Sequence, residues 1–227
     1  MFSEMTRELA ANGKLWYAIW ETLYMTVIST GIAYVLGLPL GILLNVTSAD
    51  GLRPSKLLNS VFGAIVNIFR SIPFIILMVA LLPVSKLVVG TSLGNSAMIV
   101  TLIIAAAPYI ARMVESSLNE VDRGVIEAAQ SMGTSDWKLI LHVLLPEAKP
   151  SLIIGAVISS VTVLGYSAMA GTIGGGGLGQ IAITYGYQRF NDDLIWICVA
   201  LTIIIVQIMQ EIGMRIAAKS DKRIRNK

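Results

Sequence analysis

The sequence predicts an all-α, polytopic membrane protein that forms a single transmembrane domain over residues 1–227. Of its 227 residues, 55% are hydrophobic and only 14% are charged, whereas about one quarter of the residues in a soluble domain are charged. Five segments are apolar over the roughly 20 residues that a helix needs to cross a bilayer. A polar insert, about residues 120–146, separates the third segment from the fourth.

The five predicted spans alternate with polar connections. Gly37 and Pro39 interrupt the first span, and Pro73 lies within the second. Pro73 should kink or break its helix, because proline has no backbone N–H to donate. The polar stretch of residues 1–16 lacks the apolar core of a cleaved signal peptide, so we expect it to be retained as a polar helix. The spans cover about residues 20–44, 61–82, 93–111, 152–170 and 194–217.

Basic residues are divided unequally between the two sides of this arrangement. With five spans the termini lie on opposite sides, and cytoplasmic loops are enriched in lysine and arginine. The side that holds the C-terminus, the first loop and the polar insert carries 12 basic residues, and the other side carries 4. We therefore expect the C-terminus and the polar insert in the cytoplasm and the N-terminus outside. The scattered positions of the basic residues argue against a nucleic-acid partner.

Arg70 lies inside the second predicted span. A charge at the bilayer centre costs about 2.5–3.5 kcal/mol on insertion scales, so Arg70 should contact protein, water or lipid headgroups. It is a candidate pathway residue or a contact between subunits. The alternative is a helix that begins later and leaves Arg70 near the inner surface.

The polar insert has the pattern of two short helices. Asp122 is placed to cap the first helix, and Gly133 is placed to end it in the left-handed conformation. Thr134 or Ser135 can cap the second helix, which we expect Pro146 to stop. Pro150 then suits the first turn of the fourth span. The alternative interpretation is a connector that lies on the membrane surface.

A glycine-rich run, GTIGGGGLGQ at residues 171–180, follows the fourth span on the outer side. Consecutive glycines disfavour a helix by about 1 kcal/mol each. Irregular backbone at membrane depth needs protein or a water-filled cavity around it, so we expect a re-entrant turn near the outer mouth of a pathway. The alternative is a flexible outside loop. Candidate pathway and gate residues at this end of the span are Tyr166, Ser167 and Met169.

Met169 is the candidate gate because its unbranched thioether side chain can fill a gap and move aside. Ordinary packing of a methionine is an equally good interpretation of the same residue.

The polar insert carries a spaced pattern: E-A-A, three residues, G, nine residues, an apolar β-branched residue, one residue, then L-P. This pattern resembles the signature loop of the permease subunits of bacterial ABC importers, which usually have isoleucine where Val143 stands. The resemblance implies the type I ABC importer permease fold, with a coupling helix that docks in a cleft of a separate ATPase subunit. The implied docking residues are Glu127, Ala128, Ala129 and Gly133.

Three further stretches resemble the permease of bacterial methionine importers: residues 67–77, 106–118 and 165–190. The resemblance implies a bacterial inner-membrane complex of two permease copies, two ATP-binding subunits and an external substrate-binding lipoprotein, embedded in lipid. The implied substrate is methionine, in its L and D forms. An importer of the same design for another small amino acid or related compound is the alternative.

Two other classes of protein fit the sequence less well. An intramembrane enzyme would need paired acids, a nucleophile with its base, or a metal cluster in the spans. The spans hold no aspartate, and the single histidine, His142, lies in the polar insert. We therefore predict no catalytic residue, no metal site and no cofactor. A passive channel would leave the signature loop unexplained, and the lack of G-x-x-x-x-G-K-[ST] assigns ATP binding to a partner.

Overall fold

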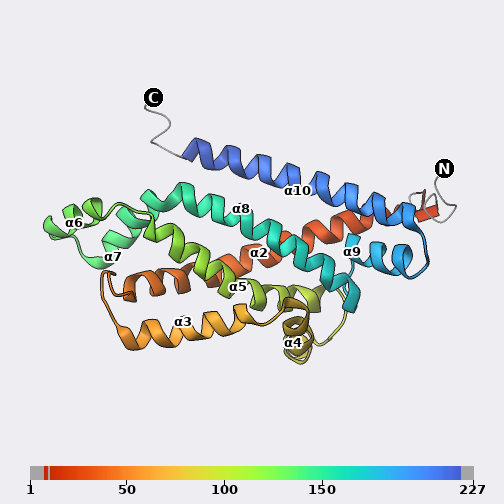
Figure 1. Ribbon diagram of the computed structural model, residues 1–227, viewed down its shortest axis with the longest axis horizontal. Helices are drawn as coiled ribbons and strands as arrows, with labels where there is room; N and C mark the ends of the chain where they lie inside the picture. Colours follow the sequence, from red (N-terminus) through yellow and green to blue (C-terminus); the bar gives the residue numbers. More distant parts are fainter. Residues whose placement is uncertain (1–7, 10, 221–227) are drawn as a thin grey trace. The chain divides into compact units, whose positions relative to one another are not determined.

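The computed structural model describes residues 8–9 and 11–220, and over these residues the chain consists of helices and connections without a strand. The all-α prediction is confirmed (Figure 1). The elements are α2 (Lys14–Thr47), α3 (Lys56–Ser71), α4 (Phe74–Val89), α5 (Asn95–Asn119), α6 (Arg123–Ser131), α7 (Asp136–Leu139), the π-helix η1 (Ile140–Leu144), α8 (Leu145–Ala170), the 3-10 helix η2 (Gly171–Ile173), α9 (Leu178–Gln180), the π-helix η3 (Ile181–Tyr187) and α10 (Asp192–Ser220).

Two of the sequence-based expectations fall on residues that lie outside this description. The predicted N-terminal helix includes residues 1–7 and 10, and most of the basic C-terminal tail lies in residues 221–227.

Four helical stretches of the described chain are long and apolar enough to cross a membrane. The pair α3 and α4 qualifies as a fifth span only if the bent pair is counted as one. The number of spans therefore stays a prediction. The four stretches are α2, α5, the run Asp136–Ile173 that contains α8, and α10.

The second predicted span is broken at Pro73, as its sequence predicts. Pro73 is the N-cap of α4 and has φ −54° and ψ 131°, an extended conformation that cannot continue α3. Arg70 lies in the last turn of α3, where a cation interacts favourably with the helix dipole. The break therefore places Arg70 at a helix end instead of at the middle of a straight span.

The predicted helix stop at Pro146 is wrong. The chain stays helical from Asp136 through α7, η1 and α8 to Ala170. The amide of Leu145 donates to the carbonyl of Ile140, which makes the turn before Pro146 a wider π-type turn. This turn relieves the clash that a proline ring makes with an α-helical carbonyl. The placement of Pro150 in the first turn is also wrong, because Pro150 lies inside α8.

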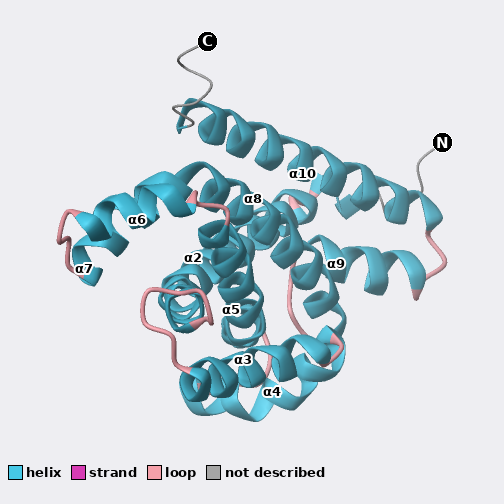
Figure 2. Cartoon of the chain, turned by 60° about the vertical axis from the view of Figure 1, so that its left-hand side comes forward, coloured by secondary structure: helices cyan, strands magenta, loops and turns pink. Residues whose placement is uncertain are grey.

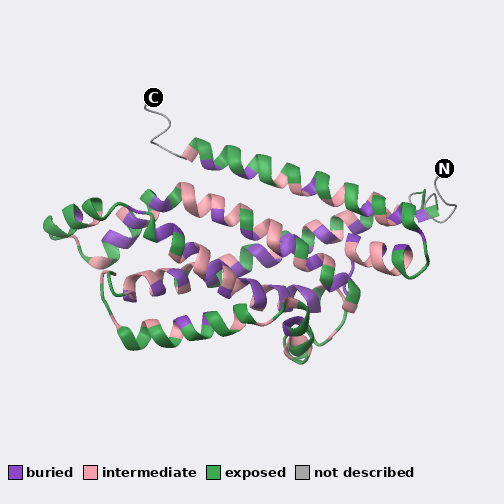
Figure 3. Cartoon of the chain, viewed as in Figure 1, coloured by how far each residue is buried: buried purple, intermediate pink, exposed green. Residues whose placement is uncertain are grey.

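The exposed side chains of α10 have the apolar character of a lipid-facing helix. Only 11% of its apolar window is buried, against 72% for the apolar window of α5 (Figure 3). Trp196 is 71% exposed and Ile203 is 55% exposed. Large apolar surfaces of this kind are not left facing water, so the surroundings of α10 are lipid or another protein.

The chain divides into two compact units. The first unit comprises Met1–Ala33, Ile72–Ala106 and Ser160–Met209. Its hydrophobic core joins α8 to α9, η3 and α10, and it includes Leu164, Leu178, Ile181, Leu194 and Cys198.

The second unit comprises Tyr34–Ser71, Ala107–Ser159 and Gln210–Lys227. In this unit α2 packs very closely on α5 through Gly37 and Gly41. A Cβ atom at Gly41 would lie 2.6 Å from the carbonyl oxygen of Ala111, and one at Gly37 would lie 2.7 Å from Ile110. Glycines four residues apart are typical of close helix–helix packing in membranes. Helix α2 continues through Gly37 and Pro39 without a break, so the expected interruption of the first span is absent and Gly37 serves close helix packing.

Candidate functional site

Helix α6 begins and ends where its sequence predicts. The carboxylate of Asp122, the N-cap residue, accepts a hydrogen bond from the amide of Gly124 at 2.7 Å. At the other end Gly133 has φ +73°. Its amide donates to the carbonyl of Gln130 at 2.9 Å, and the amide of Thr134 donates to that of Ala129 at 3.2 Å. These two bonds make a Schellman motif, in which glycine takes the left-handed position without strain.

The outward face of α6 is apolar. Val125 is 40% exposed and Met132 is 78% exposed, and Ala128 between them is also exposed. These residues are three, four and seven positions apart, so they share one side of the helix. Together with Val143 of η1 they line a shallow depression. We call Val125, Ala128 and Met132 the α6 face.

The four residues of the signature loop occupy different surroundings. Glu127 and Gly133 are exposed, as is Ala128. Ala129 is only 3% exposed, so its methyl group packs inside the chain while its neighbour faces outward. Ala129 therefore packs α6 against the rest of its own unit. The sequence pattern alone does not show which of the two alanines faces inward.

Two ion pairs connect the insert to the loop between α2 and α3 in the same unit. Arg53 pairs with Asp136 at the start of α7. Arg123 Nη2 lies 2.9 Å from Asp50 Oδ2, and both side chains are about 70% exposed (71% and 70%). Exposed pairs of this kind contribute at most about 1 kcal/mol each. They orient the insert, which appears in Figure 2 as two short helices joined by a loop.

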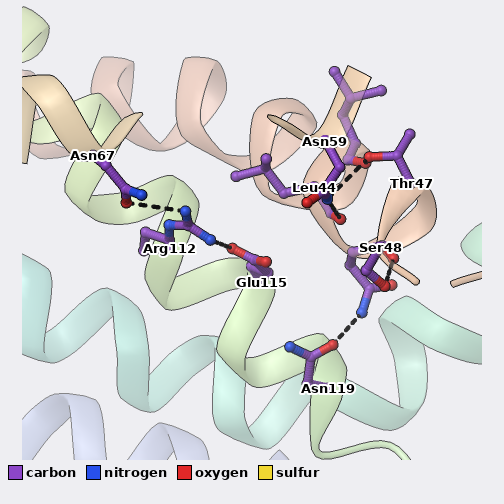
Figure 4. Close-up of polar contacts among 10 residues, drawn as sticks. Leu44, Thr47, Ser48, Asn59, Asn67, Arg112, Glu115 and Asn119 are labelled. Atoms are coloured by element: carbon purple, nitrogen blue, oxygen red, sulfur yellow. Dashed lines mark hydrogen bonds and ion pairs between the residues drawn. The ribbon is translucent and has the colours of Figure 1, made fainter. Parts of the chain in front are cut away.

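A hydrogen-bonded network supports the helices that carry the insert (Figure 4). Arg112 of α5 donates to Glu115 Oε2 at 2.6 Å and to Asn67 Oδ1 of α3 at 3.0 Å. Asn45 of α2 donates to Asn119 Oδ1, at the last residue of α5, at 2.7 Å. The network fixes the end of α5, and it therefore also fixes the start of α6, because α6 begins shortly after α5 ends.

Sequence reasoning missed this network. Asn67, Arg112 and Glu115 lie within residues 67–77 and 106–118, which the family resemblance covers, but no contact was predicted for any of the three. The available signal was their polarity within apolar stretches, because polar side chains at membrane depth need partners. Arg112 is 45 positions from Asn67 and 3 positions from Glu115, and only the fold decides the pairing of Arg112 with Asn67.

The glycine loop, residues 174–177, is bound at several points to residues of its own unit. The amide of Gly177 donates to Glu21 Oε2 of α2 at 2.9 Å, and the amide of Gly176 donates to Asn95 Oδ1 at 2.7 Å. Asn95 Nδ2 in turn donates to Glu21 Oε1 at 2.5 Å. The adjacent amide of Leu178 donates to Thr22 Oγ1 at 2.9 Å. The interpretation as a flexible loop is therefore not supported, and the re-entrant turn at a pathway mouth stays a prediction.

The candidate gate residues lie on the last turns of α8 in different environments. The ring of Tyr166 stacks on that of Phe74, with centroids 4.0 Å apart and planes 5° apart. Ser167 is 1% exposed, and its hydroxyl donates to the carbonyl of Leu164 at 2.7 Å. Met169 is 47% exposed. The structure therefore leaves Met169 accessible, whereas the Ser167 hydroxyl is occupied by its own helix.

The chain is 47% identical over 223 residues to the probable D-methionine transport system permease protein MetI of Vibrio cholerae, covering 98% of this chain and 99% of that one. It is 49% identical over 210 residues to the methionine import system permease protein MetP of Bacillus subtilis, covering 92% and 95%.

A solved structure of the MetNI methionine ABC transporter in an inward-facing conformation is similar, with a TM-score of 0.91 and 44% identity over 97% of this chain and 100% of that chain. An amino acid ABC transporter solved with histidines has a TM-score of 0.78 at 18% identity, which shows likeness of fold alone. The family model of the binding-protein-dependent transport system inner membrane component matches residues 37–226. The chain belongs to this family of inner-membrane transport components.

Proposed function

We propose that this chain is the permease subunit of an ATP-driven importer that carries methionine, in its L and D forms, through the bacterial inner membrane. Two copies form the pathway, two separate subunits bind and hydrolyse ATP, and an external binding protein delivers the amino acid. The observation that carries the proposal is the α6 face, an exposed apolar surface on a firmly mounted helix. The methionine transport proteins at 47% and 49% identity support the substrate.

The α6 face has the character of a docking surface. Val125 and Met132 are too exposed to contribute to the chain's own core, and burying one such side chain at an interface yields about 1.5–3 kcal/mol. An isolated helix of nine residues is marginal in water. Its caps and ion pairs therefore keep α6 helical before any partner binds, so the partner does not have to order the helix.

We assign the roles of the signature loop accordingly. Ala128, Glu127 and Gly133 contact the ATP-binding subunit, and buried Ala129 positions α6 for that contact. Closure of the ATP-bound partner moves α6, which shifts the spans between inward-facing and outward-facing states. The inward-facing and outward-facing states are in equilibrium. ATP and the delivered substrate shift this equilibrium because each has different affinities for the two states.

The pathway assignment rests on the end of α8. Met169 is the gate residue because it is exposed and flexible, and Tyr166 forms part of the surrounding wall through its stack on Phe74. Ser167 supports the helix through its bond to Leu164. Arg70, exposed at the end of α3, is assigned to the inner end of the pathway or to a contact between subunits.

The orientation follows from the basic residues. The insert carries Arg123 and Lys138, and α10 ends in the basic C-terminal segment. We place these segments in the cytoplasm and the N-terminus outside, because basic residues are enriched on the cytoplasmic side. The α6 face then lies on the side where ATP is present.

Co-purification tests the docking assignment. Met132→Glu adds one carboxylate to the α6 face, and the matched control Gln130→Glu adds one on the same helix in the groove toward the α2–α3 loop. We expect Met132→Glu to lower recovery of the ATP-binding subunit at least tenfold, about 1.4 kcal/mol, and Gln130→Glu to leave recovery unchanged. Equal recovery with both variants would contradict docking through this face.

The substrate is tested in the reconstituted complex with its cognate binding protein. We expect methionine to stimulate ATP hydrolysis, and other small amino acids to do so weakly. Stimulation by another compound and not by methionine would refute the substrate and leave the permease assignment in place.

A further inference from the structure

Glu21 and Asn95 form the centre of a hydrogen-bonded clamp on the glycine loop. We define the clamp as the Glu21 and Asn95 side chains with the amides of Gly176 and Gly177, joined by the three bonds of 2.5, 2.7 and 2.9 Å described above. Glu21 comes from α2, and Asn95 is the first residue of α5. Three segments that are distant in the sequence therefore meet at one carboxylate.

The clamp explains why the loop consists of glycines. A Cβ atom at Gly176 would overlap the Glu21 carboxylate, and one at Gly177 would lie 2.6 Å from Thr22 Oγ1. Gly177 also has φ +89°, which favours glycine. The backbone of the loop can approach the polar groups of α2 and α5 only because these positions have no side chain.

The carboxylate is held by neutral donors. Within the described part of the chain, Glu21 is not ion-paired with any lysine, arginine or histidine. Glu21 is half-buried. A half-buried carboxylate depends on its hydrogen bonds for compensation, so the bonds to Asn95 and Gly177 are its main stabilisation. The charge also lies at the start of the helical run formed by α9 and η3, where a helix favours an anion.

The loop transmits this constraint to the end of α8. The amide of Gly175 donates to the carbonyl of Ala170, the last residue of α8, at 3.0 Å. The backbones of Gly179 and Ala168 are in such close contact that a Cβ atom at Gly179 could not fit. Met169 lies between these two contacted residues. The position of the clamp therefore sets the position of the last turn of α8.

We infer that Glu21 and Asn95 are positioning residues for translocation: their clamp fixes the glycine loop and, through it, the turn of α8 that carries Met169. This inference rests on the proposed function. It assigns a role to a glutamate at the beginning of the first span, which the sequence analysis did not single out.

Exchanging the two functional groups tests the clamp. In Glu21→Gln one of the two donors facing residue 21 loses its acceptor, and in Asn95→Asp two carboxylates face each other. In the double variant, the amide introduced at position 21 donates to the carboxylate introduced at position 95 and accepts from Gly177. That carboxylate still accepts from Gly176. The double variant thus keeps the total charge and all three hydrogen bonds, whereas each single variant loses at least one.

The variants are compared in the complete complex, by methionine uptake in proteoliposomes and by amide hydrogen exchange of residues 174–180. We expect each single variant to lower uptake and to speed exchange within residues 174–180 about tenfold, the effect of one hydrogen bond to a charged group. The double variant should return both quantities to within about threefold of the original protein. Glu8→Gln removes an exposed carboxylate outside the insert as a control and should change neither quantity.

The two readouts separate the clamp from the proposed function. Unchanged exchange in Glu21→Gln, or a double variant no better than the worse single variant, would overturn the clamp whatever the substrate is. Faster exchange with undiminished uptake would overturn its role in translocation. A complex that recovers its ATP-binding subunit but does not take up methionine would contradict the proposed substrate alone.

Discussion

The insert around α6 and the glycine loop both depend on glycines with positive φ, but for different reasons. Gly133 has φ +73°, and a Cβ atom there would meet nothing within 4 Å. Its hydrogen bond reaches only three residues back. Gly177 has φ +89°, a Cβ atom there would strike Thr22, and its amide bonds to a residue 156 positions away.

The contrast separates a locally determined element from a tertiary one. Helix α6 depends on its own caps, and its outward face is left free for a partner. The glycine loop depends on α2 and α5, and the amides of Gly175, Gly176 and Gly177 all donate to groups of its own unit. We therefore expect substitutions in the insert to have small, local effects on stability, and substitutions in the glycine loop to affect the whole unit.

The largest effect is expected at Gly179. Gly179→Ala would place a methyl group against the backbone of Ala168, which cannot move as a side chain can. Overpacking of this kind should lower the free energy of unfolding by about 3 kcal/mol. Thermal unfolding of the purified protein would measure it. Gly165→Ala, on α8 with no atom within 4 Å, is the control and should be neutral or slightly stabilising; equal losses would refute the tertiary explanation.

A smaller effect is expected at Gly133. Gly133→Ala meets no steric obstacle, so it should cost only the left-handed backbone, about 1–2 kcal/mol. The cost should appear as faster amide exchange in α6, with unchanged exchange in the glycine loop. Gly133→Asn should recover most of the loss, because asparagine tolerates this conformation. Exchange that accelerates in both regions would contradict the local character of α6.

Removing the N-cap should cost still less. Asp122→Ala deletes the acceptor for the amide of Gly124 and should destabilise α6 by about 1 kcal/mol. Asp122→Ser keeps a capping oxygen and should remain close to the original protein. Recovery of the ATP-binding subunit in a dilution series would report the difference. Identical recovery with Ala and Ser would show that partner binding does not depend on the cap.

The smallest effect is expected for the ion pair between Arg123 and Asp50. Both side chains are mostly exposed, so their coupling should be about 0.5 kcal/mol or less and should fall with added salt. A double-mutant cycle with Arg123→Ala and Asp50→Ala would measure it. A coupling above about 2 kcal/mol would show that the insert is held mainly by electrostatics and not by its helix caps.

Sequence determined what depends on neighbours along the chain. The apolar segments, the cap at Asp122, the left-handed glycine at Gly133 and the break at Pro73 all follow from local backbone chemistry. The error at Pro146 shows the limit of this reasoning, because a wider π-type turn accommodated a proline that a regular helix would not. Local rules assume regular geometry, and the fold was free to depart from it.

Only the tertiary structure decided which groups meet across long separations. Nothing in the sequence pairs Glu21 with Gly177, or Arg112 with Asn67, and the glycine run is compatible with a free loop until its hydrogen bonds are seen. Likewise, Ala128 and Ala129 are the same type of residue in the same motif, but Ala128 faces outward and Ala129 is buried. The physical reason is that propensity and capping act over a few residues, whereas hydrogen-bond partners and burial are set by the packing of distant helices.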